Sequence, residues 1–229
     1  MEATIRPIAH IRSDFGSKFG IPRQSGLIDG LTAEIVFEPF CRDGNALRGL
    51  EGFSHIWLIW QFSANLAQGW SPTVRPPRLG GNERLGVFAT RSPFRPNALG
   101  LSCVRLLAVE TGGPEGPILR VAGADLLDGT PIFDIKPYVP YTDAHPEAKS
   151  GFAPAPEPEA LRVDYAIELL SPLPAEKRPA LLAVLAQDPR PRYQHIDGRA
   201  YGLTFAGFNV RFSVTRDVLT VLGIEKLKA

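Results

Sequence analysis

The chain has 229 residues, of which 44% are hydrophobic and 21% are charged, and its formal net charge is +1. This composition is typical of a globular protein with room for one large and one small domain, and it excludes a disordered chain and a strongly basic nucleic-acid binder. A local basic patch stays compatible with the near-neutral total, because phosphate binding depends on where the charges lie.

Cysteine, histidine and apolar patterns narrow the class of protein further. Cys41 and Cys103 stand far apart, and the four histidines have no metal-ligand spacing, so we expect no metal site and a reducing compartment. The first twenty residues lack the apolar core of a signal peptide. The longest apolar run, 180–186, is too short to span a bilayer. We therefore expect a cytoplasmic protein without a membrane partner.

The first 144 residues are predicted to be mainly β. Short runs rich in β-branched and aromatic residues lie between glycines and prolines, as in strands. These predicted strands span 4–11, 31–37, 55–62, 86–89, 101–109, 118–122 and 132–138. Residues 58–68 fit a strand or a helix. Many short strands separated by turns favour a barrel or a sandwich.

A proline-rich linker or loop is predicted at 145–160, because each proline fixes φ and removes a backbone donor. The segment that follows, 161–229, is predicted to be a small α+β domain. It has a strand at 163–169, a helix at 174–187 that becomes regular from Pro179, and a hairpin of 201–205 with 209–214. A unit this small is marginal alone, so we expect it to pack on the larger domain or on a partner subunit.

An arginine-rich segment at 75–100 is the first candidate site. It contains five arginines and one acidic residue, Glu83, together with prolines that restrict the backbone and glycines that leave it free. Arginine binds phosphate or carboxylate through two parallel hydrogen bonds, so the segment suits an anion site. A solvated, arginine-rich surface loop has the same composition.

A second candidate follows the turn at Asp128 and Gly129. Strand alternation places Asp134, Lys136 and Tyr138 on one face. If this face lines a cleft, Asp134 accepts a proton and Lys136 holds its charge nearby. An ordinary solvent-facing strand explains the pattern equally well.

Two further segments and several absent motifs complete the pattern. The loop 18–26 carries two bases, an amide and glycines, which suits an anion or an ordinary surface loop. The arginines and tyrosines of 188–211 suit single-stranded RNA, or a core with a surface hairpin. No P-loop, nucleophile elbow or dinucleotide fingerprint is present, so the usual Rossmann route to a nucleotide cofactor is missing.

Seven segments, taken together, resemble the TsaA/YaeB family, the tRNA adenosine N6-methyltransferases called TrmO. The matching segments are 11–13, 18–24, 48–57, 75–82, 86–97, 128–138 and 188–191. The resemblance covers nearly the whole chain and is less sharp after Tyr193. It implies an S-adenosyl-L-methionine (AdoMet)-binding β-barrel, closed or partly open, with a small C-terminal domain, in a homodimer. The implied reaction moves a methyl group from AdoMet to N6 of threonylcarbamoyladenosine, the modified base of tRNA immediately 3′ of the anticodon.

The resemblance also assigns residues to the site. The cofactor-binding set it implies is Arg23, Gln24, Ser25, Ser63, Arg91, Ser92, Pro93, Asn97, Leu101, Asp128, Gly129 and Thr130. For the substrate, we predict that Lys18, Arg78 or Arg95 binds the threonyl carboxylate and that Arg190, Arg192, Tyr193 and Arg211 contact RNA. Asp134, Lys136 and Tyr138 form the predicted catalytic set, unless N6 loses its proton to water. Methyl transfer from a sulfonium needs positioning and a suitable field rather than a metal.

Two other functions remain open on the sequence. One is a non-catalytic module that binds a nucleotide or RNA through the same loops. The other is an AdoMet-dependent methyltransferase with a different acceptor. The Arg/Tyr-rich C-terminal unit favours RNA, whereas the near-neutral net charge is an argument against a large RNA footprint.

Overall fold

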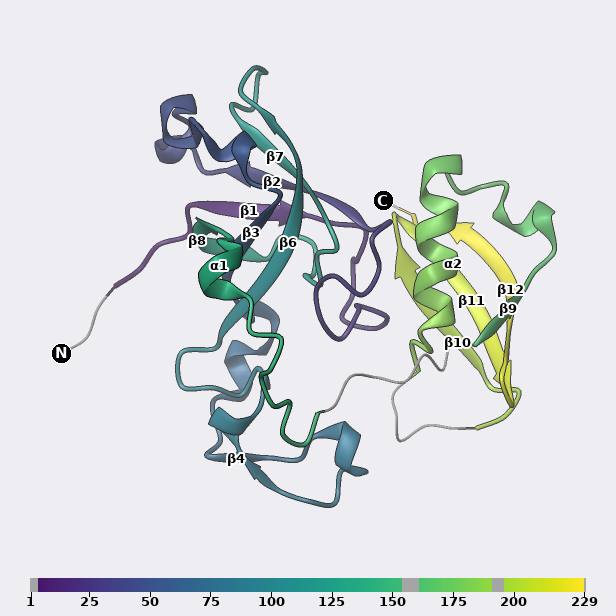
Figure 1. The fold of residues 1–229 in the computed structure, drawn as a ribbon. Coiled ribbons are helices and arrows are strands. Elements are labelled where there is room, and N and C mark those ends of the chain that lie inside the picture. The colour runs from purple at the N-terminus through teal and green to yellow at the C-terminus, as the bar shows by residue number, and fades with distance from the viewer. Residues whose placement is uncertain (1–3, 154–160, 191–195, 229) are drawn as a thin grey trace.

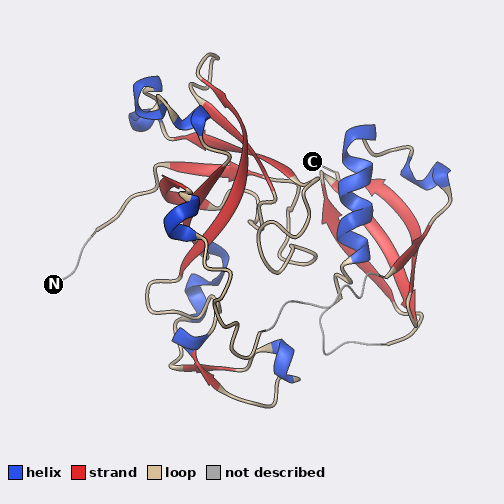
Figure 2. Ribbon diagram, viewed as in Figure 1, coloured by secondary structure: helices blue, strands red, loops and turns tan. Residues whose placement is uncertain are grey.

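A computed structural model describes residues 4–153, 161–190 and 196–228, without the side chain of Arg78. The chain forms a closed barrel and a separate sheet covered by one helix (Figures 1 and 2). In the described residues no helix is both long and apolar enough to cross a membrane. The same residues include no cluster of three or more potential metal ligands.

Six strands close the barrel, and all of their pairings are antiparallel. They are β1 (Ala9–Arg12), β2 (Thr32–Phe37), β3 (His55–Gln61), β6 (Leu99–Glu110), β7 (Ile118–Ala122) and β8 (Pro131–Pro137). Their order around the barrel is β1-β2-β7-β6-β3-β8. Alternation along β3 points Ile56, Leu58 and Trp60 inward, where each is buried. The predicted barrel is therefore confirmed, and the sandwich alternative is wrong.

An excursion between β3 and β6 departs from the predicted strands. Residues 58–68 continue β3 only to Gln61 and then form a 3-10 helix, Ser63–Gln68, which ends at Gly69 with φ 66°. The predicted strand at 86–89 is a 3-10 turn, Val87–Ala89, because the carbonyl of Val87 accepts both the amide and the hydroxyl of Thr90. Two short strands, β4 (Thr73–Val74) and β5 (Leu85–Gly86), pair within the excursion. The short helix α1 (Pro140–Asp143) follows β8.

The C-terminal sheet has the order β10-β11-β12-β9. Its elements are β9 (Arg162–Asp164), α2 (Arg178–Ala186), β10 (Ala200–Phe205), β11 (Phe208–Thr215) and β12 (Val218–Lys226). Helix α2 begins at Arg178 with Pro179 in its first turn, as predicted. The strand predicted to reach Leu169 ends at Asp164, because residues 167–170 turn into a 3-10 helix. Strand β12 was not predicted.

The loop after β1 joins the two halves. Phe15, Ile28 and Leu31 belong to the same buried cluster as α2 and the C-terminal sheet. The Phe15 ring packs edge-on against Phe205, with 5.7 Å between centroids, and the carbonyl of Asp14 accepts the amide of Ala206. The C-terminal unit thus packs on a segment of the larger domain. Of the predicted linker, residues 154–160 lie outside the described residues.

Candidate active site

A cavity of about 680 Å³ opens beside the barrel wall, in the size range of small-molecule sites. Four segments line it: the loop after β1, the end of β3 with its 3-10 helix, the Thr90–Leu101 segment, and the turn before β8. Seven of the twelve predicted cofactor-binding residues are in its lining: Arg23, Gln24, Ser63, Arg91, Pro93, Leu101 and Thr130. The other five lie in the same segments without lining it: Ser25, Ser92, Asn97, Asp128 and Gly129.

Close backbone packing fixes the loop that carries Arg23 and Gln24. The amide of Gly26 donates to the carbonyl of Gly123 at 2.9 Å, and the amide of Gly123 donates to Leu31. Gly123 has φ +79°, and a Cβ there would stand 3.1 Å from the backbone of Gly26. A side chain at Gly123 would therefore push the loop off the end of β7.

Three cations hold the segments that form the cavity. Lys18 donates its ammonium to the carbonyl of Ala64 at 2.6 Å, which joins the loop to the 3-10 helix after β3. Arg91 donates to the side-chain oxygen of Gln24, which joins the excursion to the same loop. Arg95 donates to the carbonyls of Val87 and Thr90 and so holds the turn that precedes it. These predicted ligand-binding residues also shape the cavity.

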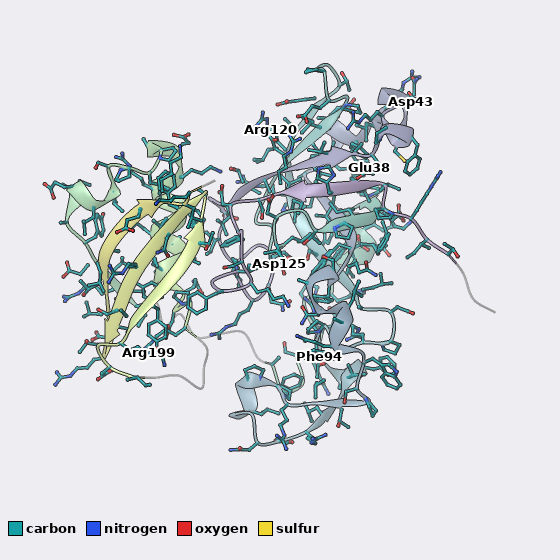
Figure 3. All side chains as sticks on the ribbon, turned by 180° about the vertical axis from the view of Figure 1, so that it is seen from behind. Glu38, Asp43, Phe94, Arg120, Asp125 and Arg199 are labelled. Carbon is teal, nitrogen blue, oxygen red and sulfur yellow. The ribbon has the colours of Figure 1, made fainter. Side chains whose placement is uncertain are left out.

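A hydrogen-bonded chain runs from the barrel interior to the cavity. The indole Nε1 of Trp60 donates to Ser102 Oγ at 3.0 Å, and Ser102 donates to Asp125 Oδ1 at 2.6 Å. An indole N–H can only donate, so the Ser102 oxygen accepts from it and uses its own proton toward Asp125. Trp60 and Ser102 are 7% and 1% exposed. Asp125 lies near the centre of the molecule (Figure 3) and lines the cavity together with Trp60.

Burial raises the pKa of Asp125 above that of an exposed aspartate. Hydrogen bonds from the Ser102 hydroxyl and from backbone amides, together with the charge of Arg91, act in the opposite direction. Among the described residues that line the cavity, Asp125 is the single carboxylate beside four cations: Lys18, Arg23, Arg91 and Arg95. The cavity is thus a positively charged site with one partly desolvated anion.

The predicted catalytic set lies outside this cavity lining. Asp134 and Lys136 share one face of β8, as predicted, and form an exposed ion pair at 3.3 Å. The Tyr138 ring lies 5.7 Å from that of Trp57, whose indole donates to Asp143 of α1. The catalytic role of these three residues stays a prediction.

The predicted substrate-binding residues lie in different parts of the structure. Lys18 and Arg95 line the cavity. Arg190 is 6% exposed and donates two hydrogen bonds to Asp188, each of 2.8 Å, so its guanidinium is already engaged. Arg211 is exposed on β11, in the C-terminal sheet. Arg192, Tyr193 and the side chain of Arg78 lie outside the described residues.

Sequence reasoning missed Asp125, Ser102 and Trp60 as site residues. Asp125 lies three residues before the turn at Asp128, outside the strand face on which the prediction rested. A detectable pattern was present, because Asp125 interrupts an otherwise apolar run from Val121 to Leu127. An acid in such a run is buried and needs hydrogen-bond partners.

The sequence matches two family models in consecutive regions. The model of the tRNA-methyltransferase O N-terminal domain matches residues 10–144. The model of the TrmO C-terminal domain matches residues 158–227.

Relatives and solved structures agree with these models. The tRNA (adenine(37)-N6)-methyltransferase of Escherichia coli strain K12 is 42% identical over 226 residues, covering 95% of this chain and 96% of that protein. A Pseudomonas aeruginosa PAO1 protein named "Putative S-adenosylmethionine-dependent methyltransferase RcsF" is 42% identical and covers 98% of both chains. A crystal structure of TrmO superposes with a TM-score of 0.79 at 37% identity, covering 98% of this chain and 100% of that one.

Proposed function

Because the chain belongs to the tRNA-methyltransferase O family, we propose that it transfers a methyl group from AdoMet to N6 of the adenosine at position 37 of tRNA. We propose further that its acceptor is threonylcarbamoyladenosine. The observation that carries this proposal is the cavity itself, where segments from four parts of the chain bring four cations and one carboxylate together. A module that only bound nucleotide or RNA finds no support among these relatives.

The residues of the cavity suit AdoMet. Its carboxylate matches guanidinium groups, and Arg23 of the loop after β1 and Arg91 of the excursion both line the cavity. The apolar part of the lining, with Ile59, Phe62 and Leu101, suits an adenine ring. When bound, AdoMet supplies an electrophilic methyl group. The residues of the chain bind it and hold the acceptor in line with it.

A threonylcarbamoyl group adds a second carboxylate, and the excess of cations in the cavity supports this acceptor. Lys18 and Arg95 lie in the lining beside the proposed AdoMet residues. Each already binds backbone carbonyls, which fixes its position. A preorganised cation loses less conformational entropy when a carboxylate arrives.

The first experiment is methyl transfer from radiolabelled AdoMet into two tRNA pools. One pool carries threonylcarbamoyladenosine, and the other is transcribed without modification. We expect label in the modified pool alone. Equal label in both pools would remove the threonylcarbamoyl group from the proposal, and no label in either, with AdoMet bound, would point to another acceptor.

Arg95→Ala tests the carboxylate recognition separately. We expect it to reduce the preference for modified over unmodified tRNA by about 10-fold or more, because one charge-assisted hydrogen bond contributes about 1.5–3 kcal/mol. Unchanged discrimination would remove Arg95 from this role.

We also propose that the protein is a homodimer in the cytoplasm. Support comes from the family resemblance and from large apolar side chains exposed at Leu101 (55%) and Phe88 (75%). Light scattering during gel filtration tests the dimer, and a monomeric mass would refute it. Cell fractionation tests the location.

A further inference from the structure

Within the part of the cavity's lining that the structure describes, one side chain can take a proton. Among the described residues of its lining, the ionisable groups other than Asp125 are Lys18, Arg23, Arg91 and Arg95. Lysine and arginine side chains are cations at neutral pH and cannot accept a proton. No histidine, cysteine, glutamate or tyrosine is in that lining. Among the described residues of the lining, Asp125 is therefore the side chain that can act as a base.

The surroundings of Asp125 suit a base as well. Its carboxylate is oriented by neutral donors: the Ser102 hydroxyl at 2.6 Å and backbone amides, including that of Ser25. Ser102 is in turn fixed by Trp60, whose ring lies against Gly100 in the barrel wall. A carboxylate held in this way keeps its orientation and remains on the cavity surface.

We propose that Asp125 is the catalytic residue that accepts the N6 proton of the acceptor base during methyl transfer, with Ser102 as its positioning residue. This inference rests on the proposed function and deepens it. N6 forms its bond to the methyl carbon while the carbon–sulfur bond breaks, and sulfur keeps that electron pair and becomes a neutral thioether. The N6 proton passes to the Asp125 carboxylate and then to water, so charge and atoms balance.

The rival role for Asp125 is binding the ammonium or a ribose hydroxyl of AdoMet. The two roles differ in what the loss of the charge changes. A base affects the rate at saturating AdoMet and its dependence on pH, whereas a cofactor ligand affects the dissociation constant of AdoMet.

The experiment compares wild type with Asp125→Asn, Asp125→Glu and Ser102→Ala. Asp164→Asn is the matched control, since Asp164 is an exposed aspartate of β9 in the C-terminal sheet. Single-turnover methyl transfer into modified tRNA is measured across pH, and AdoMet binding is measured by calorimetry. We expect Asp125→Asn to lower the rate by about 100-fold or more and to bind AdoMet within about 3-fold of wild type. Asp125→Glu should recover part of the rate, and Ser102→Ala should shift the pH profile.

A spectroscopic measurement on the wild type makes the test independent of the variants. In wild type the rate should rise with pH as Asp125 loses its proton, because the cations that line the cavity with it, Lys18, Arg23, Arg91 and Arg95, are of residue types that stay charged in that range. The midpoint of this rise should match the titration of the Asp125 carboxyl carbon observed by NMR without ligand. Asp125→Asn should lose the rise.

Three results would overturn the inference. A near-normal saturated rate in Asp125→Asn with AdoMet binding weakened more than about 10-fold would make Asp125 a cofactor ligand. If the rate and the pH profile were unchanged in Asp125→Asn, the N6 proton would pass to water and not to Asp125. A carboxyl titration far from the kinetic midpoint would separate Asp125 from the titrating step. If wild type did not methylate modified tRNA at all, the proposed function would fail first, and that result is distinct from these three.

Discussion

One added methyl group at Gly100 tests how tightly the barrel wall fixes Trp60. An ideal Cβ at Gly100 would stand 2.5 Å from Cζ2 and 2.7 Å from Cδ2 of the indole, which is closer than real Cβ atoms approach. Trp60 is 7% exposed and is held by its hydrogen bond to Ser102, so it has little room to move. Overpacking costs about 1–3 kcal/mol, and losing that hydrogen bond costs about 1 kcal/mol more. We expect Gly100→Ala to lower the free energy of unfolding by about 2–4 kcal/mol.

Urea denaturation followed by circular dichroism measures this loss. Gly223→Ala in β12 is the matched control, because a Cβ there meets nothing within 4 Å. The control should change stability by less than about 1 kcal/mol, in the stabilising direction. Trp60→Phe shortens the ring, so Gly100→Ala should cost less in that background. A loss at Gly100 no larger than at Gly223 would refute the reasoning.

Three further changes test the rest of the argument. Phe15→Ala should lower the free energy of unfolding by about 3–5 kcal/mol, since this ring is 1% exposed and fills the contact between the loop after β1 and the C-terminal sheet. Calorimetric unfolding measures this loss. A loss under about 1 kcal/mol would show that the contact contributes little to stability. Asp134→Asn should keep the methyl-transfer rate within about 3-fold of wild type, since Asp134 lies outside the cavity lining; a loss as large as that of Asp125→Asn would restore the predicted catalytic set. Burial raises the pKa of Asp125 above its value in the unfolded chain. Between these two pKa values the native state keeps a proton that the unfolded chain has lost, so stability falls as pH rises through this window. Asp125→Asn removes this pH-dependent loss of stability, so above the window the variant should have a higher melting temperature than wild type. An equal or lower melting temperature there would contradict a raised pKa of Asp125 in the native state.

The barrel was predictable because its strands alternate, and the fully buried positions of β3 recur at every second residue. The excursion was less predictable, since hydrogen bonds around Val87 and Thr90 override a β-rich composition. At the site, the resemblance pointed to the loops that line the cavity but not to Asp125. Its partner Ser102 lies 23 positions earlier on β6, whereas Asp125 lies in the loop after β7, and barrel closure rather than sequence spacing brings the two together.

The loop after β1 connects the cavity to the C-terminal sheet. On its apolar side, Phe15 and Phe19 pack on Phe205, Tyr201 and Phe212, while Lys18, Arg23 and Gln24 line the cavity. If a ligand contacts Lys18, Arg23 and Gln24 only while the loop is packed on the C-terminal sheet, its binding free energy also stabilises that contact. At a ligand concentration of 100 times the dissociation constant this stabilisation is about 2.7 kcal/mol. By the same linkage, we expect substitutions that loosen this contact to weaken binding in the cavity, although α2 and β10–β12 contribute no residue to its described lining.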